Sequence, residues 1–146
     1  MEYLFKKADG VVSTRVGYMG GHKKYPTYQE VCGGTTGHIE AMEVVYDAAG
    51  TDYEKMAKLF FEIHDPTQVD SQGPDSGEQY KSAIFYADKK QKETAEKLID
   101  ILEGKGLHVA TELISAETFW EAEDYHQDYY AKTGKRPYCH VYQKRF

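Results

Sequence analysis

The sequence has few cysteines, no excess of basic residues and no long apolar run. It contains two cysteines in 146 residues, which is too few for a disulfide scaffold, so a reducing compartment, the cytoplasm, is expected. No apolar run approaches the ~18 residues of a membrane-spanning helix, and no secretory signal follows Met1. The net charge of -6 makes nucleic acid and anionic membranes unexpected partners.

The remaining composition indicates a soluble globular protein. Hydrophobic residues make up 40% and charged residues 29% of the chain, and the length predicts one domain over residues 1–146. Thirteen tyrosines are unusual. Each joins an apolar ring to a hydroxyl group, so they suit either the surroundings of a ligand or ordinary core and rim packing.

The central stretch is residues 26–40, P-T-Y-Q-E-V-C-G-G-T-T-G-H-I-E. Its glycines allow sharp bends and close backbone approach. It ends at Glu40, where an apolar run begins, and a carboxyl group there is costly unless it is protonated or hydrogen-bonded, with Tyr28 as a possible partner. Two interpretations stay open: the floor of an active site with Glu40 as its acid, or a Gly-rich turn with a surface Glu and a buried structural Cys32.

Periodicity and capping signals predict helices alternating with strands. The helices are predicted at Met1–Lys7, at Thr51–His64 with Thr51 as the cap, at Asp88–Gly104, and in part of Trp120–Lys132. The strands are predicted at Val12–Tyr18, His38–Tyr46, Tyr80–Tyr86 and Leu107–Ile114, with polar loops before Gly37 and at Thr67–Gln79. A long coil is expected from Arg136.

This order of elements predicts an α+β fold, a two-layer α/β sandwich with a mixed sheet. A further strand before Met1 would give the split arrangement of a ferredoxin-like core. Within His38–Tyr46, alternation puts Glu40 on the bulkier and more apolar face and Glu43 on the other. Glu40 is therefore the carboxyl group predicted to point inward.

Five motifs, in order, resemble the MsrA family, the peptide methionine sulfoxide reductases specific for the S epimer. They are G-Y-M-G-G at 17–21, the stretch at 26–40, F-F-E-I-H-D-P-T-Q at 60–68, Q-G-P-D-S-G-E-Q-Y-K-S-A-I at 72–84 and A-E-D-Y-H-Q-D-Y at 122–129. The resemblance implies a peptide-methionine (S)-S-oxide reductase that repairs methionine sulfoxide, free or in proteins. It implies no cofactor, only an external thiol reductant such as thioredoxin or glutaredoxin, and a monomer when complete.

The resemblance also implies roles for individual residues. By position it makes Glu40 the acid, Tyr28 and Tyr80 the groups that hold the sulfoxide oxygen, Asp75 a residue that steadies the site, Tyr138 a neighbour of the pocket and Cys139 a resolving thiol. It implies no metal ligand. From the residues alone, Asp75 is a turn residue before Gly77, and Cys139 is either an idle cysteine or a thiolate favoured by His140.

The family places its nucleophile in a G-C-F-W-G motif at the end of its first strand, and the Phe and Trp supply much of an apolar cage. The sequence begins at Met1, directly after that position. Residues 1–146 are therefore expected to lack the nucleophile, the cage and the first strand, and to be inactive alone. Three explanations are open: a truncated gene product, a misplaced start at an internal methionine, one version of which is a selenocysteine codon read as a stop, and a pseudoenzyme. The alternative function is a non-catalytic module that binds oxidised methionine.

Overall fold

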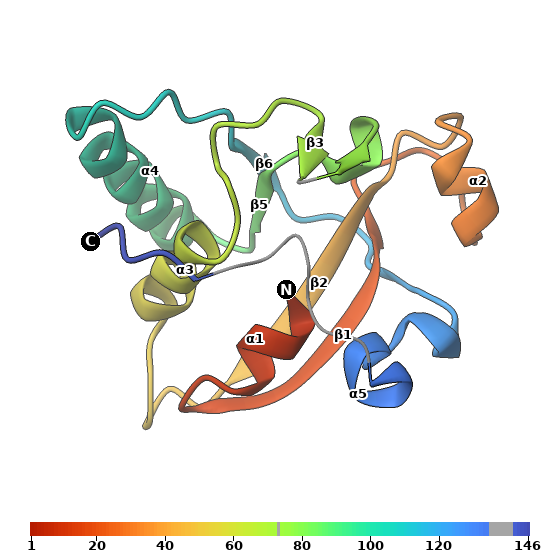
Figure 1. Ribbon diagram of the computed structural model, residues 1–146, viewed down its shortest axis with the longest axis horizontal. Helices are drawn as coiled ribbons and strands as arrows, with labels where there is room; N and C mark the ends of the chain where they lie inside the picture. Colours follow the sequence, from red (N-terminus) through yellow and green to blue (C-terminus); the bar gives the residue numbers. More distant parts are fainter. Residues whose placement is uncertain (73, 135–141) are drawn as a thin grey trace.

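The computed structural model describes residues 1–72, 74–134 and 142–146 (Figure 1). Helices occur together with both antiparallel and parallel strand pairs, so the fold is α+β with mixed pairing. The predicted coil, with Tyr138 and Cys139, lies outside the described residues.

The elements alternate along the chain as the periodicity predicts. The helices are α1 (Glu2–Lys6), α2 (Tyr28–Cys32), α3 (Tyr53–Glu62), α4 (Lys89–Gly104) and α5 (Tyr129–Thr133), with 3-10 turns η1 (Glu78–Tyr80) and η2 (Asp124–His126). The strands are β1 (Val11–Met19), β2 (Ile39–Tyr46), β3 (Ser71–Gln72), β4 (Asp75–Ser76), β5 (Ala83–Tyr86), β6 (Glu112–Ser115) and β7 (Trp120–Glu121).

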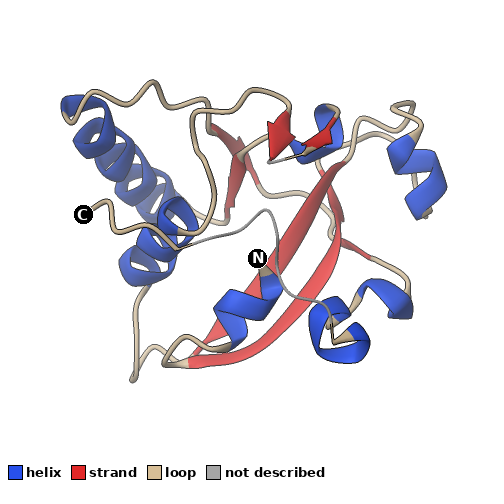
Figure 2. Cartoon of the chain, in the orientation of Figure 1, coloured by secondary structure: helices blue, strands red, loops and turns tan. Residues whose placement is uncertain are grey.

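The strands form three separate sheets within the described residues (Figure 2). β1 lies between β2 and β7 and is antiparallel to both. β5 and β6 are parallel, joined through α4, and β3 pairs with β4. The two-layer, ferredoxin-like arrangement remains a prediction, because the pairings alone do not establish it.

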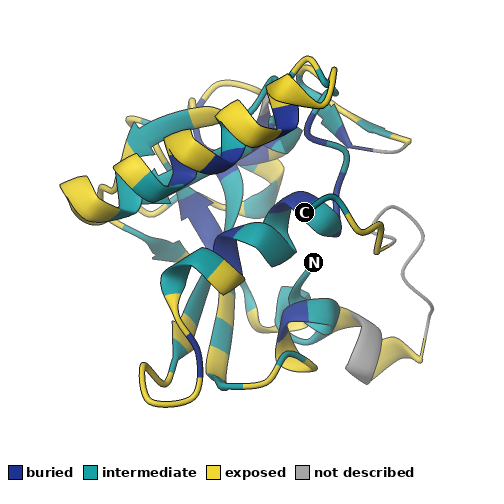
Figure 3. Cartoon of the chain, turned by 90° about the vertical axis from the view of Figure 1, so that its left-hand side faces the viewer, coloured by how far each residue is buried: buried dark blue, intermediate teal, exposed yellow. Residues whose placement is uncertain are grey.

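Two apolar clusters hold the helices on these sheets. Phe5 of α1 packs with Met56 of α3 and with Met42 of β2. Phe61 of α3 is fully buried against Leu98 of α4. Figure 3 shows the exposed residues of α4 on its outer side. The clusters seat α1 and α3 on the face of β2 that carries Glu40.

Beyond the short β7, the side chain of Gln127 hydrogen-bonds to the outer edge of β1. The backbone N–H of Val16 donates to Oε1 of Gln127 at 2.8 Å, and Nε2 of Gln127 donates to the carbonyl of Val16 at 2.7 Å. The amide of Ala122 donates to the same carbonyl at 2.9 Å. β2 has no partner strand on its other edge in the described part of the chain.

The predicted loop before Gly37 is wrong in part, because it contains α2. Thr27 accepts from the backbone N–H of Glu30, whose side chain accepts from the N–H of Thr27. This reciprocal capping box stabilises a helix of only five residues. The P-T-x-x-E signal was present in the sequence, but no apolar periodicity follows it.

Helix caps and strand ends differ from the prediction by a few residues. Asp52, not Thr51, caps α3, because its carboxylate accepts from the N–H of Lys55 at 2.8 Å. α4 ends at Gly104 as predicted, and the left-handed glycine that follows it is Gly106, with φ of 94°. The last two long strands are shorter than predicted, and β3 and β4 lie inside the predicted loop.

No helix among residues 1–72, 74–134 and 142–146 has both the length and the apolar character needed to cross a membrane.

Candidate functional site

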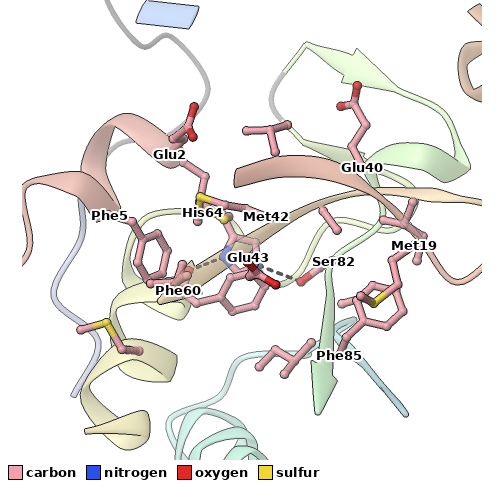
Figure 4. Close-up of a pocket in the computed structure, with 18 of the residues that line it drawn as sticks. Glu2, Phe5, Met19, Glu40, Met42, Glu43, Phe60, His64, Ser82 and Phe85 are labelled. Atoms are coloured by element: carbon pink, nitrogen blue, oxygen red, sulfur yellow. Dashed lines mark hydrogen bonds between the residues drawn. The ribbon is translucent and has the colours of Figure 1, made fainter. Parts of the chain in front are cut away.

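β2 carries the predicted acid into the interior. Glu40 lies directly opposite Tyr18 in the β1–β2 ladder, so the two side chains share a face. That face continues with Met42 in the core, as predicted. Glu43 projects from the other side of the strand (Figure 4), where its side chain is 39% exposed and accepts from Arg15 at 2.9 and 3.0 Å.

Burial changes the acidity of Glu40. It raises the pKa of this carboxyl to about 7, and the negative charge of Asp75 adds to the effect. A carboxyl with this pKa keeps much of its proton at neutral pH, so it can donate a proton where an ordinary Glu cannot. This is the environment of a catalytic acid.

A tight turn brings Asp75 and Tyr80 to Glu40. Gly77, with φ of 137°, adopts a conformation that other residues rarely take, and its N–H donates to the carbonyl of Asp70 at 2.9 Å. The N–H of Tyr80 then donates to the carbonyl of Gly77 at 3.0 Å, which closes η1. Glu40, Asp75 and Tyr80 line one cavity of about 790 Å³.

α2 brings Tyr28 to the same place. The Cys32 side chain is the largest cause of the raised pKa of Tyr28, and Tyr28 and Tyr80 lie close enough to affect each other's pKa. Burial, followed by the charge of Glu40, raises the pKa of Tyr80 to about 12. Both phenols therefore stay protonated at neutral pH and remain hydrogen-bond donors.

Glu123 holds this group together and had no role in the sequence prediction. Its carboxylate accepts from the hydroxyl of Tyr18 and from the backbone N–H of Tyr28, both at 3.2 Å, and from the hydroxyl of Tyr125 at 3.2 Å. The residue lies in the motif at 122–129, and that motif was the only signal for it. Glu123 fixes the start of α2 relative to β1.

The two cysteines have different outcomes. Cys32 is exposed, so the interpretation of a buried structural cysteine is wrong. Its side chain lies close enough to Tyr28 to be the largest cause of the raised pKa of that phenol. Cys139 and Tyr138 lie outside the described residues, so their predicted roles stay predictions.

The arrangement suits protonation of an oxygen atom in an apolar surrounding. A partly neutral carboxyl and the phenol of Tyr80 line a cavity whose wall also includes Met42, Phe60 and Phe85, and the phenol of Tyr28 lies near Tyr80 behind that wall. Within the described residues, no three His, Cys, Asp or Glu side chains lie together in a way that could hold a metal ion.

Comparison with known proteins gives a consistent result. A family model described as "Peptide methionine sulfoxide reductase" matches residues 1–146. The chain is 48% identical over 139 residues to the protein named peptide methionine sulfoxide reductase MsrA of Nautilia profundicola, covering 95% of this chain and 80% of that one.

Solved structures agree with the sequence comparison. Reduced Mxr1 from Saccharomyces cerevisiae superposes with a TM-score of 0.84 at 33% identity, over 92% of this chain and 79% of that one. Methionine sulfoxide reductase A of Corynebacterium diphtheriae gives 0.80 at 39% identity, over 91% and 69%. Mxr1 has also been solved in complex with Trx2, where the likeness is one of fold alone, at 21% identity and a TM-score of 0.56.

Proposed function

Because the chain belongs to the peptide methionine sulfoxide reductase family, we propose that Glu40, Tyr28 and Tyr80 form the acid side of its active site. The reaction of the family is the reduction of methionine sulfoxide to methionine. The observation that carries the proposal is the buried carboxyl of Glu40, with its pKa raised to about 7, beside two protonated phenols.

In the proposed reduction step, the sulfoxide oxygen accepts hydrogen bonds from Tyr28 and Tyr80. A thiolate or selenolate attacks the sulfoxide sulfur and supplies the electron pair that the sulfur retains as a thioether. Glu40 donates its proton to the oxygen, which leaves the substrate and ends as the hydroxyl of a sulfenic or selenenic acid. Asp75 contributes by keeping Glu40 protonated, since its charge raises the pKa of that carboxyl.

A second thiol completes the proposed cycle. It attacks the sulfenic or selenenic sulfur or selenium, forms a mixed bond and releases the oxygen as water. Cys139 is the proposed second thiol, with Tyr138 beside the pocket. Thioredoxin or glutaredoxin is the proposed reductant, and the complex of the relative Mxr1 with Trx2 supports the former.

Three further properties are proposals of the same kind: residues 1–146 as one domain, action as a monomer, and a cytoplasmic location. The few cysteines of the sequence support the last, and the resemblance to the family is the ground for the monomer. The alternative of a binding module without turnover is not favoured, because the relatives are named as reductases.

The proposed role of Glu40 as the acid is tested by comparing Glu40 with Glu43, a second carboxyl group on the same strand. In a chain extended before Met1 by a strand ending in G-C-F-W-G, Glu40→Gln keeps the shape of the side chain but removes its acidic proton. We expect single-turnover oxidation of the nucleophile to slow by about 10²- to 10⁴-fold. This measurement separates the reduction step from thiol recycling.

Glu43→Gln is the matched control, because Glu43 bonds to Arg15 at the surface, on the opposite side of β2. It should leave the single-turnover rate almost unchanged. If Glu40→Gln slows the step no more than Glu43→Gln does, Glu40 is not the acid.

A further inference from the structure

The charge that acts on Glu40 is carried by a very small hairpin. Asp75 lies in β4, and β4 pairs with β3 alone among the described strands, near the end of β2 that carries Glu40 (Figure 1). Each of the two strands has two residues. An isolated two-stranded hairpin is marginally stable at best. Contacts with other parts of the chain must therefore fix the position of Asp75.

The side chain of Gln72 makes such a contact. Gln72 lies directly opposite Asp75 in the hairpin, so the two side chains share a face. Its amide group reaches the turn that follows α3. The backbone N–H of Asp65 donates to Oε1 of Gln72 at 2.9 Å, and Nε2 of Gln72 donates to the carbonyl of Asp65 at 3.3 Å. One side chain thus pairs with both backbone groups of one residue, as a neighbouring strand would.

Burial makes the contact between Gln72 and Asp65 difficult to replace. Gln72 is 8% exposed. A buried backbone N–H or C=O group that loses its partner finds little water to bond with instead, so the loss is costly. An amide group and a peptide group do not titrate near neutral pH, so the contact is the same on both sides of the pKa of Glu40.

The turn that Gln72 binds is itself fixed to two further strands. His64, directly before Asp65, is 4% exposed, and its Nε2 forms a hydrogen bond with the hydroxyl of Ser82, just before β5, at 2.7 Å. The carbonyl of Pro66, directly after Asp65, accepts from the N–H of Ala110, just before β6, at 2.7 Å. The hairpin is therefore bound to a point that β5 and β6 hold in place.

Asp75 is the charged group that this contact brings to Glu40. The other titratable groups that interact with the charge of Glu40 are phenols: Tyr18 opposite it on β1, Tyr28 of α2 and Tyr80 of η1. Phenols are uncharged near neutral pH, since their ordinary pKa is about 10. A displacement of Asp75 would therefore change the charge that adds to the effect of burial on Glu40.

We propose that Gln72 is a positioning residue for Asp75: its side-chain amide binds the β3–β4 hairpin to the turn after α3 and so holds the carboxylate of Asp75 beside Glu40. The inference rests on the proposed role of Glu40 as the acid, because it concerns what sets the proton content of that group. Gln72 acts on the acid through Asp75.

The test measures the pKa of Glu40 directly, from the pH dependence of the chemical shift of its carboxyl carbon in residues 1–146. Gln72→Met keeps the length of the side chain and removes both hydrogen bonds to Asp65. We expect the pKa of Glu40 to fall, by at least about half of the fall that Asp75→Asn produces, because Asp75 is no longer held beside it.

A double variant separates positioning from a general loss of structure. If Gln72 acts through Asp75, Gln72→Met has no charge left to displace once Asp75→Asn is present. The double variant should then have the same pKa of Glu40 as Asp75→Asn alone. Asp52→Ala is the matched control, because it removes the cap at the start of α3 and should destabilise the fold without changing the pKa of Glu40.

An unchanged pKa of Glu40 in Gln72→Met would overturn the proposal. So would a fall that is equally large when Asp75→Asn is already present, or an equal fall in Asp52→Ala. If Gln72→Met does not fold, Gln72→Asn is measured in its place with the same expectations, because its shorter side chain cannot reach both backbone groups of Asp65.

The measurement requires no turnover, so its failure is distinct from failure of the proposed function. An unchanged pKa in Gln72→Met would remove the role of Gln72 and leave that of Glu40 intact. The role of Glu40 is decided separately, by the single-turnover rate of Glu40→Gln.

Discussion

Glu40 and Asp75 place two carboxyl groups on one cavity, and the charge of Asp75 adds to the larger effect of burial in raising the pKa of Glu40 to about 7. The two residues come from β2 and β4, 35 positions apart in the chain. Their proximity links the position of a loop to the acidity of a strand residue.

The reduction step should slow as pH rises through about 7 in the extended chain. The proton donor is the neutral form of Glu40, and its fraction falls about tenfold per pH unit above the pKa. Ionisation of the attacking thiol has the opposite effect on the rate, because it produces more of the reactive thiolate as pH rises. A single-turnover pH profile therefore separates the two.

Asp75→Asn is the control for that profile. It removes the neighbouring charge but keeps the size of the side chain, so the pKa of Glu40 falls and the descending limb moves to lower pH. If the rate falls at the same pH in Asp75→Asn as in the unsubstituted protein, the titrating group is not Glu40. The same conclusion follows if Glu40→Gln still shows the fall in rate at high pH.

The two tyrosines should each be less critical than Glu40. Tyr28 and Tyr80 lie close enough to affect each other's pKa, so Tyr28→Phe or Tyr80→Phe leaves one hydroxyl that can donate to the sulfoxide oxygen. We expect each single variant to slow single-turnover reduction by about tenfold, the cost of roughly one hydrogen bond, and the double variant by more than the product. If each single Tyr→Phe variant reduces the sulfoxide as slowly as Glu40→Gln does, this division of roles is wrong.

A polypeptide of residues 1–146 alone should show no appreciable sulfoxide reductase activity with dithiothreitol. Neither Cys32 nor Cys139 occupies the position of the family's nucleophile, although the thiol of Cys32 lies beside Tyr28. Release of methionine from the sulfoxide is the measurement. Turnover that disappears in Cys32→Ser or Cys139→Ser would identify that cysteine as a nucleophile.

Removal of the α3 cap should destabilise the fold. Asp52→Ala takes away the carboxylate that accepts from the N–H of Lys55, at a cost of about 1 kcal/mol in the free energy of unfolding. Asp52→Asn retains an acceptor and should cost much less. Urea denaturation measures the free energy of unfolding of both variants. If the two variants lose the same amount of stability, the capping hydrogen bond contributes little.

Local signals in the sequence predicted most elements because each element has its own pattern. The alternation in β2 placed Glu40 inward, since only one face of that strand is continuously apolar. The cap of α3 was missed by one residue, because Thr51 and Asp52 are both able to cap and only tertiary contacts decide between them. β3 and β4 have two residues each, too few for any periodicity.

The candidate site was harder to predict than the fold. Tyr28, Asp75 and Tyr80 were identified by resemblance, and no spacing in the sequence shows that they meet. Glu123 was missed because its function is to accept hydrogen bonds from residues about 100 positions away.

The bond from the Val16 amide to the side chain of Gln127 has a consequence for hydrogen exchange. This amide lies in the middle of a nine-residue strand, where slow exchange normally reports on the sheet. Its partner is a side chain of the segment after η2, so its exchange reports on the docking of that segment. The Val16 amide is thus a local probe of whether the segment that carries Glu123, and with it the position of Tyr28, is in place.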